Sequence, residues 1–414
     1  GMGERMYTAV SRWISFLPGG LIHTNIASCA IFAACSGSSV ATSATISRVS
    51  LPTFRSRGYN ERLVIGSLAA GGTLGILIPP SIGLIVYGVL VEESIGRLYL
   101  AGFIPGIMLA VMMIVMIIGA SILFPSIAPK EPSASWRDKF IGLFSMIPVL
   151  LIIAVVLGSI YQGWATPTEA AAFGVTGALI LALINNSGPA IAGWFLHLLP
   201  PSGSQTSFIG QLQERYPVTN GLMRESITIN FDMIKDSILS TVRTSSMIML
   251  IVVSAFTLSF AFARLGISHD ISQWIIGADL SSTQLVIVLV IFYLLLGTFM
   301  ESFAMLVTTV PILAPALTAT GVDLVWFGII MVILVEAALI SPPEGINLYV
   351  LHGVRRDVQA EMAEASGAAE EVGTITDVYI GVLPFMGVMA AAIVLLIIFP
   401  DIALWLPNLV KGAR

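Results

Sequence analysis

Two long apolar segments of this chain are each broken by a pair of prolines, and these breaks limit its fold more than any other feature. They lie in "GILIPPSIG" (75–83) and "LISPPEGIN" (339–347). Proline has no backbone N–H and interrupts a helix. In lipid, the backbone groups that such a break leaves free must find partners in protein or in a water-filled cavity. The breaks therefore predict internal sites rather than simple spans.

The composition places these segments in a membrane. Of the 414 residues, 56% are hydrophobic and 10% are charged, whereas soluble domains carry about 25% charged residues. We expect an all-α polytopic membrane protein whose uninterrupted spans, each of about 20 residues, lie at 98–123, 140–160, 169–186, 244–263 and 378–399. Cys29 and Cys35 are expected as small buried residues without a disulfide. No histidine or cysteine spacing indicates a resident metal or an organic cofactor.

The region before each double proline is also interrupted. Small polar residues occur at "SGSS" (36–39) before the first pair and at "GTFMES" (297–302) before the second. Ser36 precedes Pro79 by 43 positions, and Gly297 precedes Pro342 by 45. The same order at the same spacing predicts an internal repeat. Each unit would be a re-entrant helical hairpin, with its tip inside the membrane, followed by a helix that unwinds halfway.

The basic residues predict how the two repeats are oriented. If the first hairpin opens on one side of the membrane and the second on the other, counting crossings puts 15 of the 19 Lys and Arg residues on the first side. The four on the other side are Arg97, Arg264, Lys411 and Arg414. Because positive residues concentrate in cytoplasmic loops, the first side is expected to be the cytoplasm and the repeats inverted.

Inverted repeats with discontinuous helices at the bilayer midplane are typical of secondary transporters. Helix N-termini there attract anions, and free carbonyls and hydroxyls suit Na⁺. We interpret Ser36–Ser39 as a tip of this kind, although Ser/Gly pairs also serve close helix packing. Glu336 is a candidate cation ligand or proton carrier, and so is Glu301, which also fits a charge at a helix start. Asn25 is expected to bond between helices or to reach the tip.

Several stretches resemble one family, the large membrane subunit of tripartite ATP-independent periplasmic (TRAP) transporters of the DctM type. They are "LPGGLIHTNIASCAIFAACSGSS" (17–39), "GTLGILIPPSIGLIVYGVL" (72–90), "TPTEAAAFG" (166–174) and "EAALISPPEGINLYV" (336–350). The likeness covers nearly the whole chain apart from 187–230 and the acidic loop. Thr166 to Glu169 also has the form of a helix-start capping box.

The resemblance implies an elevator-type, Na⁺-coupled importer in the bacterial inner membrane. A periplasmic solute-binding protein (DctP type) would deliver an organic anion, and a small membrane subunit (DctQ type) would brace the scaffold; no nucleic acid is expected among the partners. Carried onto this sequence, the resemblance implies a first Na⁺ site at Ser36, Gly37, Ser38, Ser39, Thr73 and Gly75, a second at Gly297, Thr298, Ser341, Pro342 and Gly345, and an anion near Ser39, Ser81 and Asn347.

The expected organisation has eight parts. They are an N-terminal interfacial helix at 1–19, a first transport region at 20–97, scaffold spans at 98–186, a cytoplasmic insertion and connecting helix at 187–243, a scaffold span at 244–280, a second transport region at 281–356, an acidic loop at 357–376, and a C-terminal span and tail at 377–414. Compared with the family, the chain is expected to lack about two N-terminal spans. Glu344 stands where an apolar residue is common, and Thr42-Ser43 stand where an acidic residue often follows the first tip.

Other functions remain open at this stage. A Na⁺/dicarboxylate symporter or a cation/proton antiporter that works without a binding protein fits the repeats equally well, and only the family-like motifs favour the TRAP type. An intramembrane enzyme would need paired aspartates, a zinc-binding histidine cluster or a Ser/His pair, and none is arranged here. A channel is less favoured because no ring of polar pore-lining positions repeats.

Overall fold

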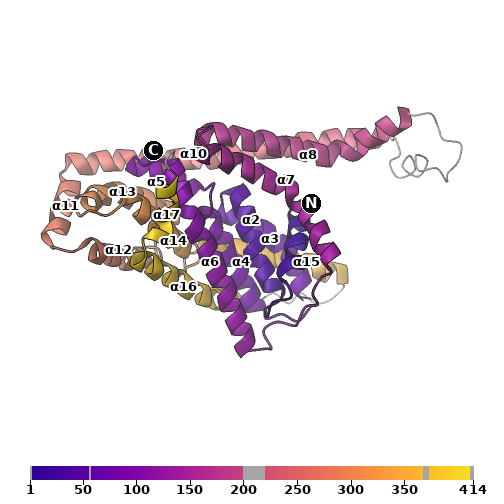
Figure 1. Cartoon of the computed structure of the whole chain (residues 1–414), viewed down its shortest axis with the longest axis horizontal. Helices are drawn as coiled ribbons and strands as arrows, with labels where there is room; N and C mark the ends of the chain where they lie inside the picture. Colours follow the sequence, from indigo (N-terminus) through magenta and orange to yellow (C-terminus); the bar gives the residue numbers. More distant parts are fainter. Residues whose placement is uncertain (1, 56, 199–219, 367–372, 411–414) are drawn as a thin grey trace.

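The computed structural model describes residues 2–55, 57–198, 220–366 and 373–410, and in these residues it is helical without strands (Figure 1). The helices are α1 (Met2–Ile14), α2 (Leu21–Ser36), α3 (Ser39–Arg55), α4 (Glu61–Leu77), α5 (Ile82–Val91), α6 (Ile95–Leu123), α7 (Trp136–Tyr161), α8 (Pro167–Leu198), α10 (Asn220–Arg264), α11 (Ile267–Gly277), α12 (Ser282–Leu296), α13 (Ser302–Ala319), α14 (Leu324–Leu339), α15 (Ile346–Ser366), α16 (Ile375–Ile398) and α17 (Asp401–Leu409).

The predicted membrane class is confirmed. Six helices in the described residues are long and apolar enough to cross a membrane, and the bent pair α4 and α5 makes a possible seventh span. The five expected spans lie in α6, α7, α8, α10 and α16, to within one residue. The re-entrant hairpins and the elevator arrangement stay predictions.

The two halves of the chain repeat one order of elements. A short helix, a pair of helices around a small-residue break, a helix that ends at a double proline, its continuation and a long span follow one another in α1–α6 and again in α11–α16. The first proline break bends the chain by 42° between α4 and α5. Both Pro–Pro peptide bonds are cis.

Packing is exchanged between the halves, which supports the predicted repeat. Helix α3 packs on α15, and its counterpart α13 packs on α5. Likewise α4 packs on α16, and its counterpart α14 packs on α6. Neither half therefore forms a separate core. The interrupted helices of both halves lie within one shared interior, where nearly every side chain of α4 and α14 is buried.

Helices α8 and α10 extend side by side well beyond the rest of the molecule (Figure 1). Asn186 donates to Asn230 Oδ1 (3.0 Å), and Asn230 donates to Ser187 Oγ (2.7 Å). The connecting helix expected within 187–243 is present and is continuous with the following span in α10. At the other end of the expected insertion, α8 continues unbroken through Leu198. Residues 199–219 lie outside the described residues.

Helix α15 runs into the segment that the sequence marked as an acidic loop. It continues through Ser366, so the first ten residues of 357–376 are helical. Helix α16 then starts at a capping box in which Asp377 accepts from the backbone N–H and hydroxyl of Thr374 (3.1 and 3.0 Å). The start of α16 is thereby fixed next to the start of α4 and to α15.

Helices α4 and α16 touch through two glycines. A Cβ on Gly66 would lie 1.9 Å from the Gly381 carbonyl oxygen, and a Cβ on Gly381 would lie 2.2 Å from the Arg62 carbonyl oxygen. No side chain fits at either position without separating the helices. The backbones themselves therefore form the contact that sets the distance of α16 from the first interrupted helix.

We expect Gly66→Ala to lower the thermal stability of the purified protein, because overpacking a tight contact costs about 1–3 kcal/mol. Gly158→Ala in α7 is the matched control, since nothing lies within 4 Å of its Cβ position and alanine favours helix over glycine. A melting curve in detergent should fall by several degrees for the first variant and hold or rise for the second. Equal curves would contradict the close contact.

Candidate functional site

The first tip is a two-residue break between α2 and α3. Gly37 ends α2 in the left-handed conformation, with φ of 59°, which only glycine adopts without strain. A Cβ there would also lie 3.0 Å from the Pro80 carbonyl oxygen. The tip thus rests directly on the first proline break. The small-residue segment and the double proline, both predicted to form the first site, are in contact.

Gly75 of α4 lies on the other side of the tip. A Cβ on Gly75 would lie 2.9 Å from both the carbonyl carbon and the oxygen of Ser38. The buried Ser39 hydroxyl donates to the Thr73 carbonyl (3.1 Å). Residues 37–39, 73–75 and 80, distant in sequence, are therefore held in contact by glycine packing and one side-chain hydrogen bond.

Hydroxyl groups order the backbone of the tip. The Thr42 hydroxyl donates to the Ser38 carbonyl (2.8 Å), and Ser36 and Thr42 share a hydrogen bond of 2.7 Å. Sequence comparison marked Thr42 only as a departure from the family. In the structure it takes part in the tip, and its spacing of one helical turn from Ser38 is the signal that points to it.

Two other predicted residues of the first site satisfy helix ends. The Thr73 hydroxyl donates to the Ala70 carbonyl within α4 (2.7 Å), so this side chain bonds to its own helix. Ser81 is the N-cap of α5, where its hydroxyl accepts from the Leu84 N–H (3.2 Å) and donates to the Ile76 carbonyl. Ser81 therefore bridges the proline break.

The second tip is more open. Gly297 ends α12, and its Cβ position would lie 2.8 Å from the Ala338 side chain, so this tip also lies against its own interrupted helix. The half-buried Thr298 donates to the Leu295 carbonyl (2.7 Å). Glu301 caps α13 by accepting from the Ala304 N–H (2.8 Å). Of the two interpretations of Glu301, this contact fits the charge at a helix start.

Beyond the second double proline the chain turns tightly. Ser341 is buried and Gly345 packs on the end of α14, where a Cβ would lie 2.7 Å from the Leu339 carbonyl oxygen. Pro342 lies between them in the break. In the part of the chain that the structure describes, no side-chain hydrogen bond joins Thr298 to these residues, so the second set lies less closely together than the first.

Glu336 connects the two interrupted helices. Its carboxylate on α14 is completely buried, and Oε1 accepts from the Leu77 backbone N–H at the end of α4 (3.1 Å). Within the described residues, Oε2 has no hydrogen-bond partner. A buried carboxylate in a membrane span is costly and marks function by default. Here it holds the two breaks side by side.

Asn347 is the clearest unsatisfied group near these breaks. It is 0% exposed, and neither amide atom has a partner in the part of the chain that the structure describes. Arg48 of α3 pairs with Asp357 of α15 (3.7 Å). Toward the C-terminal end of both helices, Leu51 of α3 and Val358 of α15 line the same cavity. The two helices therefore run parallel. Counting back about ten residues in each helix at about 1.5 Å per residue puts Asn347 level with the first tip.

Several other sequence predictions have clear outcomes. Asn25 is an inter-helix partner, as it accepts from Tyr7 (3.0 Å) and donates to Ser67 (2.9 Å), instead of reaching the tip. Both cysteines are free, but only Cys29 is buried as expected; Cys35 is exposed. The capping box at the start of α8 is confirmed, with Glu169 accepting from the Thr166 N–H (2.8 Å).

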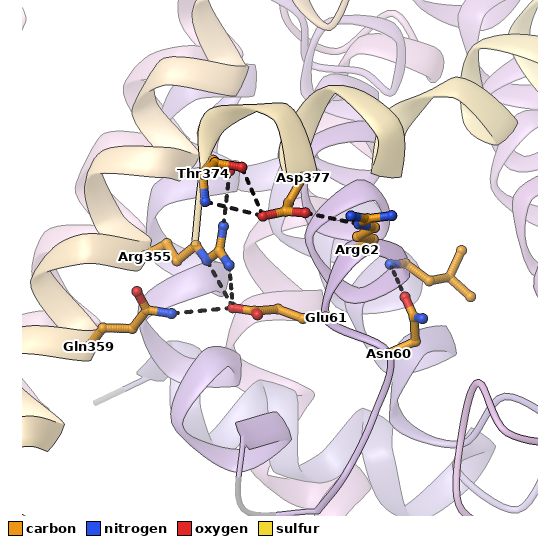
Figure 2. Close-up of polar contacts among 8 residues, drawn as sticks. Asn60, Glu61, Arg62, Arg355, Gln359, Thr374 and Asp377 are labelled. Atoms are coloured by element: carbon orange, nitrogen blue, oxygen red, sulfur yellow. Dashed lines mark hydrogen bonds and ion pairs between the residues drawn. The ribbon is translucent and has the colours of Figure 1, made fainter. Parts of the chain in front are cut away.

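A charged cluster joins α4, α15 and α16 (Figure 2). No sequence pattern predicted it. The Arg355 side chain is only 2% exposed and pairs with Glu61 at 2.7 Å, while its Nη1 donates to the Thr374 carbonyl (3.3 Å). Arg62 pairs with Asp377 at 2.9 Å. These contacts join residues of both halves that the charge count had assigned to one side.

A second polar group lies in the loops of the same region. The Tyr59 hydroxyl donates to Glu131 (3.0 Å) and accepts from the Leu21 N–H (3.1 Å), and Arg57 pairs with Glu131 at 2.8 Å. Burial raises the pKa of Tyr59 above its ordinary value. The phenol therefore keeps the proton that it donates, and the loop after α6 stays tied to the start of α2.

An apolar cavity of about 540 Å³ separates the first tip from two of the spans. Cys35 and Pro80 line one side of it. The other side consists of apolar residues of α7 and α8, among them Val149, Ile152, Val156, Ala171 and Val175. The interrupted helices of the first half therefore face α7 and α8 across an apolar cavity.

Multiple apolar spans, a duplicated order of helices and buried polar breaks define a multi-pass membrane protein of the transporter class. The comparison with protein families identifies the group within that class. Residues 1–402 match the model for the "Tripartite ATP-independent periplasmic transporter, DctM component". The chain belongs to this family, which consists of transport permeases and not of enzymes.

Individual relatives agree with this assignment. The chain is 29% identical to the C4-dicarboxylate TRAP transporter large permease protein DctM of Vibrio cholerae, over 100% of this chain and 83% of the relative. It is 30% identical to the protein of the same description in Rhodobacter capsulatus, over 99% and 83%. It is also 29% identical to the sialic acid TRAP transporter large permease protein SiaM of Vibrio cholerae, over 100% and 83%.

We expect Glu61→Gln to destabilise the fold by about 1–3 kcal/mol, because it leaves the buried Arg355 guanidinium without its charge partner. Arg48→Gln is the matched control. It removes one member of a pair whose side chains are 64% and 61% exposed, and such pairs contribute about 0–1 kcal/mol. Thermal melting should separate the two variants by several degrees, and equal losses would show that the buried pair has no special role.

Proposed function

We propose that this protein is the membrane permease of a Na⁺-coupled system that takes up an organic carboxylate across the bacterial inner membrane. The observation that carries the proposal is the convergence of the first tip on its own broken helix. There, the Ser38 carbonyl lies against the buried Gly75, and the Thr73 carbonyl accepts from the buried Ser39 hydroxyl. Membership of the family indicates that the protein is a transport permease. The coupling ion and the substrate class are our proposal.

The chemistry of the tip suits Na⁺ as transported cargo. Na⁺ prefers hard oxygen ligands, and carbonyls of unwound backbone provide them without adding charge. The Ser38 carbonyl accepts from the Thr42 backbone N–H (3.1 Å) and from the Thr42 and Ser36 hydroxyls (2.8 and 3.4 Å), and the Thr73 carbonyl accepts from the Ser39 hydroxyl (3.1 Å). Na⁺ would take the place of hydroxyl donors at these oxygens, since a hydroxyl can rotate away. With the Ser36 and Ser39 hydroxyls and Gly37 the two carbonyls would form the first site. Gly297, Thr298, Ser341, Pro342 and Gly345 would form the second.

The anionic substrate would bind between the tips, near Ser39, Ser81 and Asn347. Ser39 and Ser81 stand at the N-terminal ends of α3 and α5, and Asn347 stands in the first turn of α15. Helix N-termini carry partial positive charge and free N–H groups that favour a carboxylate. The unpartnered amide of Asn347 would supply a further donor and acceptor for the polar part of the substrate.

The named relatives guide the choice of substrate class. Two are described for C4-dicarboxylates and one for sialic acid, and these compounds share a carboxylate. We propose that a periplasmic solute-binding protein delivers the substrate and that a small membrane subunit accompanies the permease. Movement of the interrupted helices past α7 and α8 is the proposed transport step. The apolar cavity between them supports it, since few polar bonds would have to break.

Uptake should require both sodium and the soluble partner. In proteoliposomes, the initial rate of carboxylate uptake is expected to rise with a Hill coefficient above one in Na⁺, because two sites are proposed. A rate independent of Na⁺ would contradict ion coupling. Full uptake of free substrate without any binding protein would instead favour a stand-alone Na⁺/dicarboxylate symporter.

The tip itself can be tested with one added methyl group. Gly75→Ala should lower Na⁺-driven uptake by about ten-fold or more, since displacing the Ser38 carbonyl costs about 1–3 kcal/mol. Gly119→Ala in α6 is the matched control because nothing lies within 4 Å of its Cβ position. Immunoblots of membranes should show equal amounts of both variants. Ser39→Leu and Gly37→Val are expected to abolish uptake in the same assay, and normal uptake would remove the tip from the mechanism.

A further inference from the structure

A polar cavity of about 480 Å³ lies between α1 and α7, outside the interrupted helices. The two helices touch beside it, since a Cβ on Gly142 would lie 3.2 Å from the Ala9 Cα. Polar groups of both helices face the cavity, with Arg5, Thr8 and Arg12 on α1 and Ser145 on α7. Nothing in the proposed transport mechanism uses this cavity.

The charge of the cavity is not balanced by close ion pairs. Arg5 donates to the Asn185 side-chain oxygen (3.4 Å), and Arg12 donates to the Asp138 carbonyl (3.2 Å). Across the described ranges, no ion pair is found for either guanidinium. Glu4 also lines the cavity, so its lining residues carry a net charge of one positive. Each guanidinium has five N–H donors and so keeps donors for an anion.

The surroundings place the cavity at the level of lipid head groups. It lies beside the first turns of α7, a membrane span, on the side that the charge count predicts to be cytoplasmic. The Lys139 ammonium lies 5.1 Å from the Phe16 ring centroid and 4.9 Å from that of Trp136. Exposed aromatic and basic residues at the end of a span are typical of the membrane interface.

We propose that this cavity binds the phosphate head group of a membrane phospholipid. Arg5 and Arg12 donate to the phosphate oxygens, and the Thr8 and Ser145 hydroxyls add hydrogen bonds. The acyl chains follow α7, where Phe144 and Leu151 are 70% and 58% exposed. This apolar path next to the cations favours a lipid over a soluble anion. Because α1 packs on α2 and α3 as well as on α7, the bound lipid holds the first hairpin helices near that span.

Native mass spectrometry of the protein, purified with its accompanying membrane subunit, tests this proposal. Phosphatidylglycerol is titrated into the detergent-solubilised protein and the bound lipids are counted. The double variant Arg5→Gln/Arg12→Gln is expected to lose one lipid, with its affinity reduced about ten-fold or more, as loss of charged hydrogen bonds implies. Arg137→Gln, an exposed cation at the start of α7 outside the cavity, should bind lipid normally.

A second variant keeps the charges and fills the space. Ser145→Phe should also lose the lipid, and its exposed position makes a folding defect easy to separate by thermal melting. An unchanged affinity in both variants overturns the proposal, and so does an equal loss in Arg137→Gln. Competition by millimolar inorganic phosphate would show a soluble-anion site and overturn the lipid assignment; no competition supports it.

Discussion

Backbone groups freed inside a membrane must find partners, and the interior of this protein is arranged around that requirement. Two double prolines interrupt α4 and α14, and each interruption is met by a short tip from its own half. The Glu336 carboxylate then accepts a backbone N–H from the end of α4. Ser81 bridges its own break by bonding to Ile76 and Leu84. The polar centre exists because these breaks satisfy one another.

The exchange of contacts between the halves explains how such a centre stays in place. Since α3 lies on α15 and α4 on α16, neither half can shift its break without moving helices of the other. At the start of α4 the Arg355–Glu61 pair stabilises this arrangement. The Arg355 side chain is 2% exposed and the Glu61 side chain 52%. A buried charge that loses its partner is costly, so the cluster favours one relative position of α4 and α15. Apolar packing against α7 and α8 imposes no comparable restraint.

Spans, breaks and the repeat could be predicted from the sequence because each rests on local rules. The length of an apolar segment indicates a membrane span, and a proline interrupts a helix. The spacing of Thr166 and Glu169 indicates a capping box at a helix start. Contacts between distant segments could not be predicted in the same way. Arg355 was counted only as a cytoplasmic cation, and no sequence pattern near it indicates that Glu61 is its partner. The length of α8 was also missed, because residues after 186 were assigned to an insertion and not to the helix that continues through Leu198.

The length of α10 has a consequence of its own. Its 45 residues extend about 68 Å at 1.5 Å per residue, over twice the roughly 30 Å hydrocarbon thickness of a bilayer. The exposed Asp232, Lys235 and Asp236 lie in its first half, so that half belongs in water or among head groups. A continuous rod of this kind acts as a lever: a small tilt of its membrane-embedded end sweeps the far end through a much larger arc.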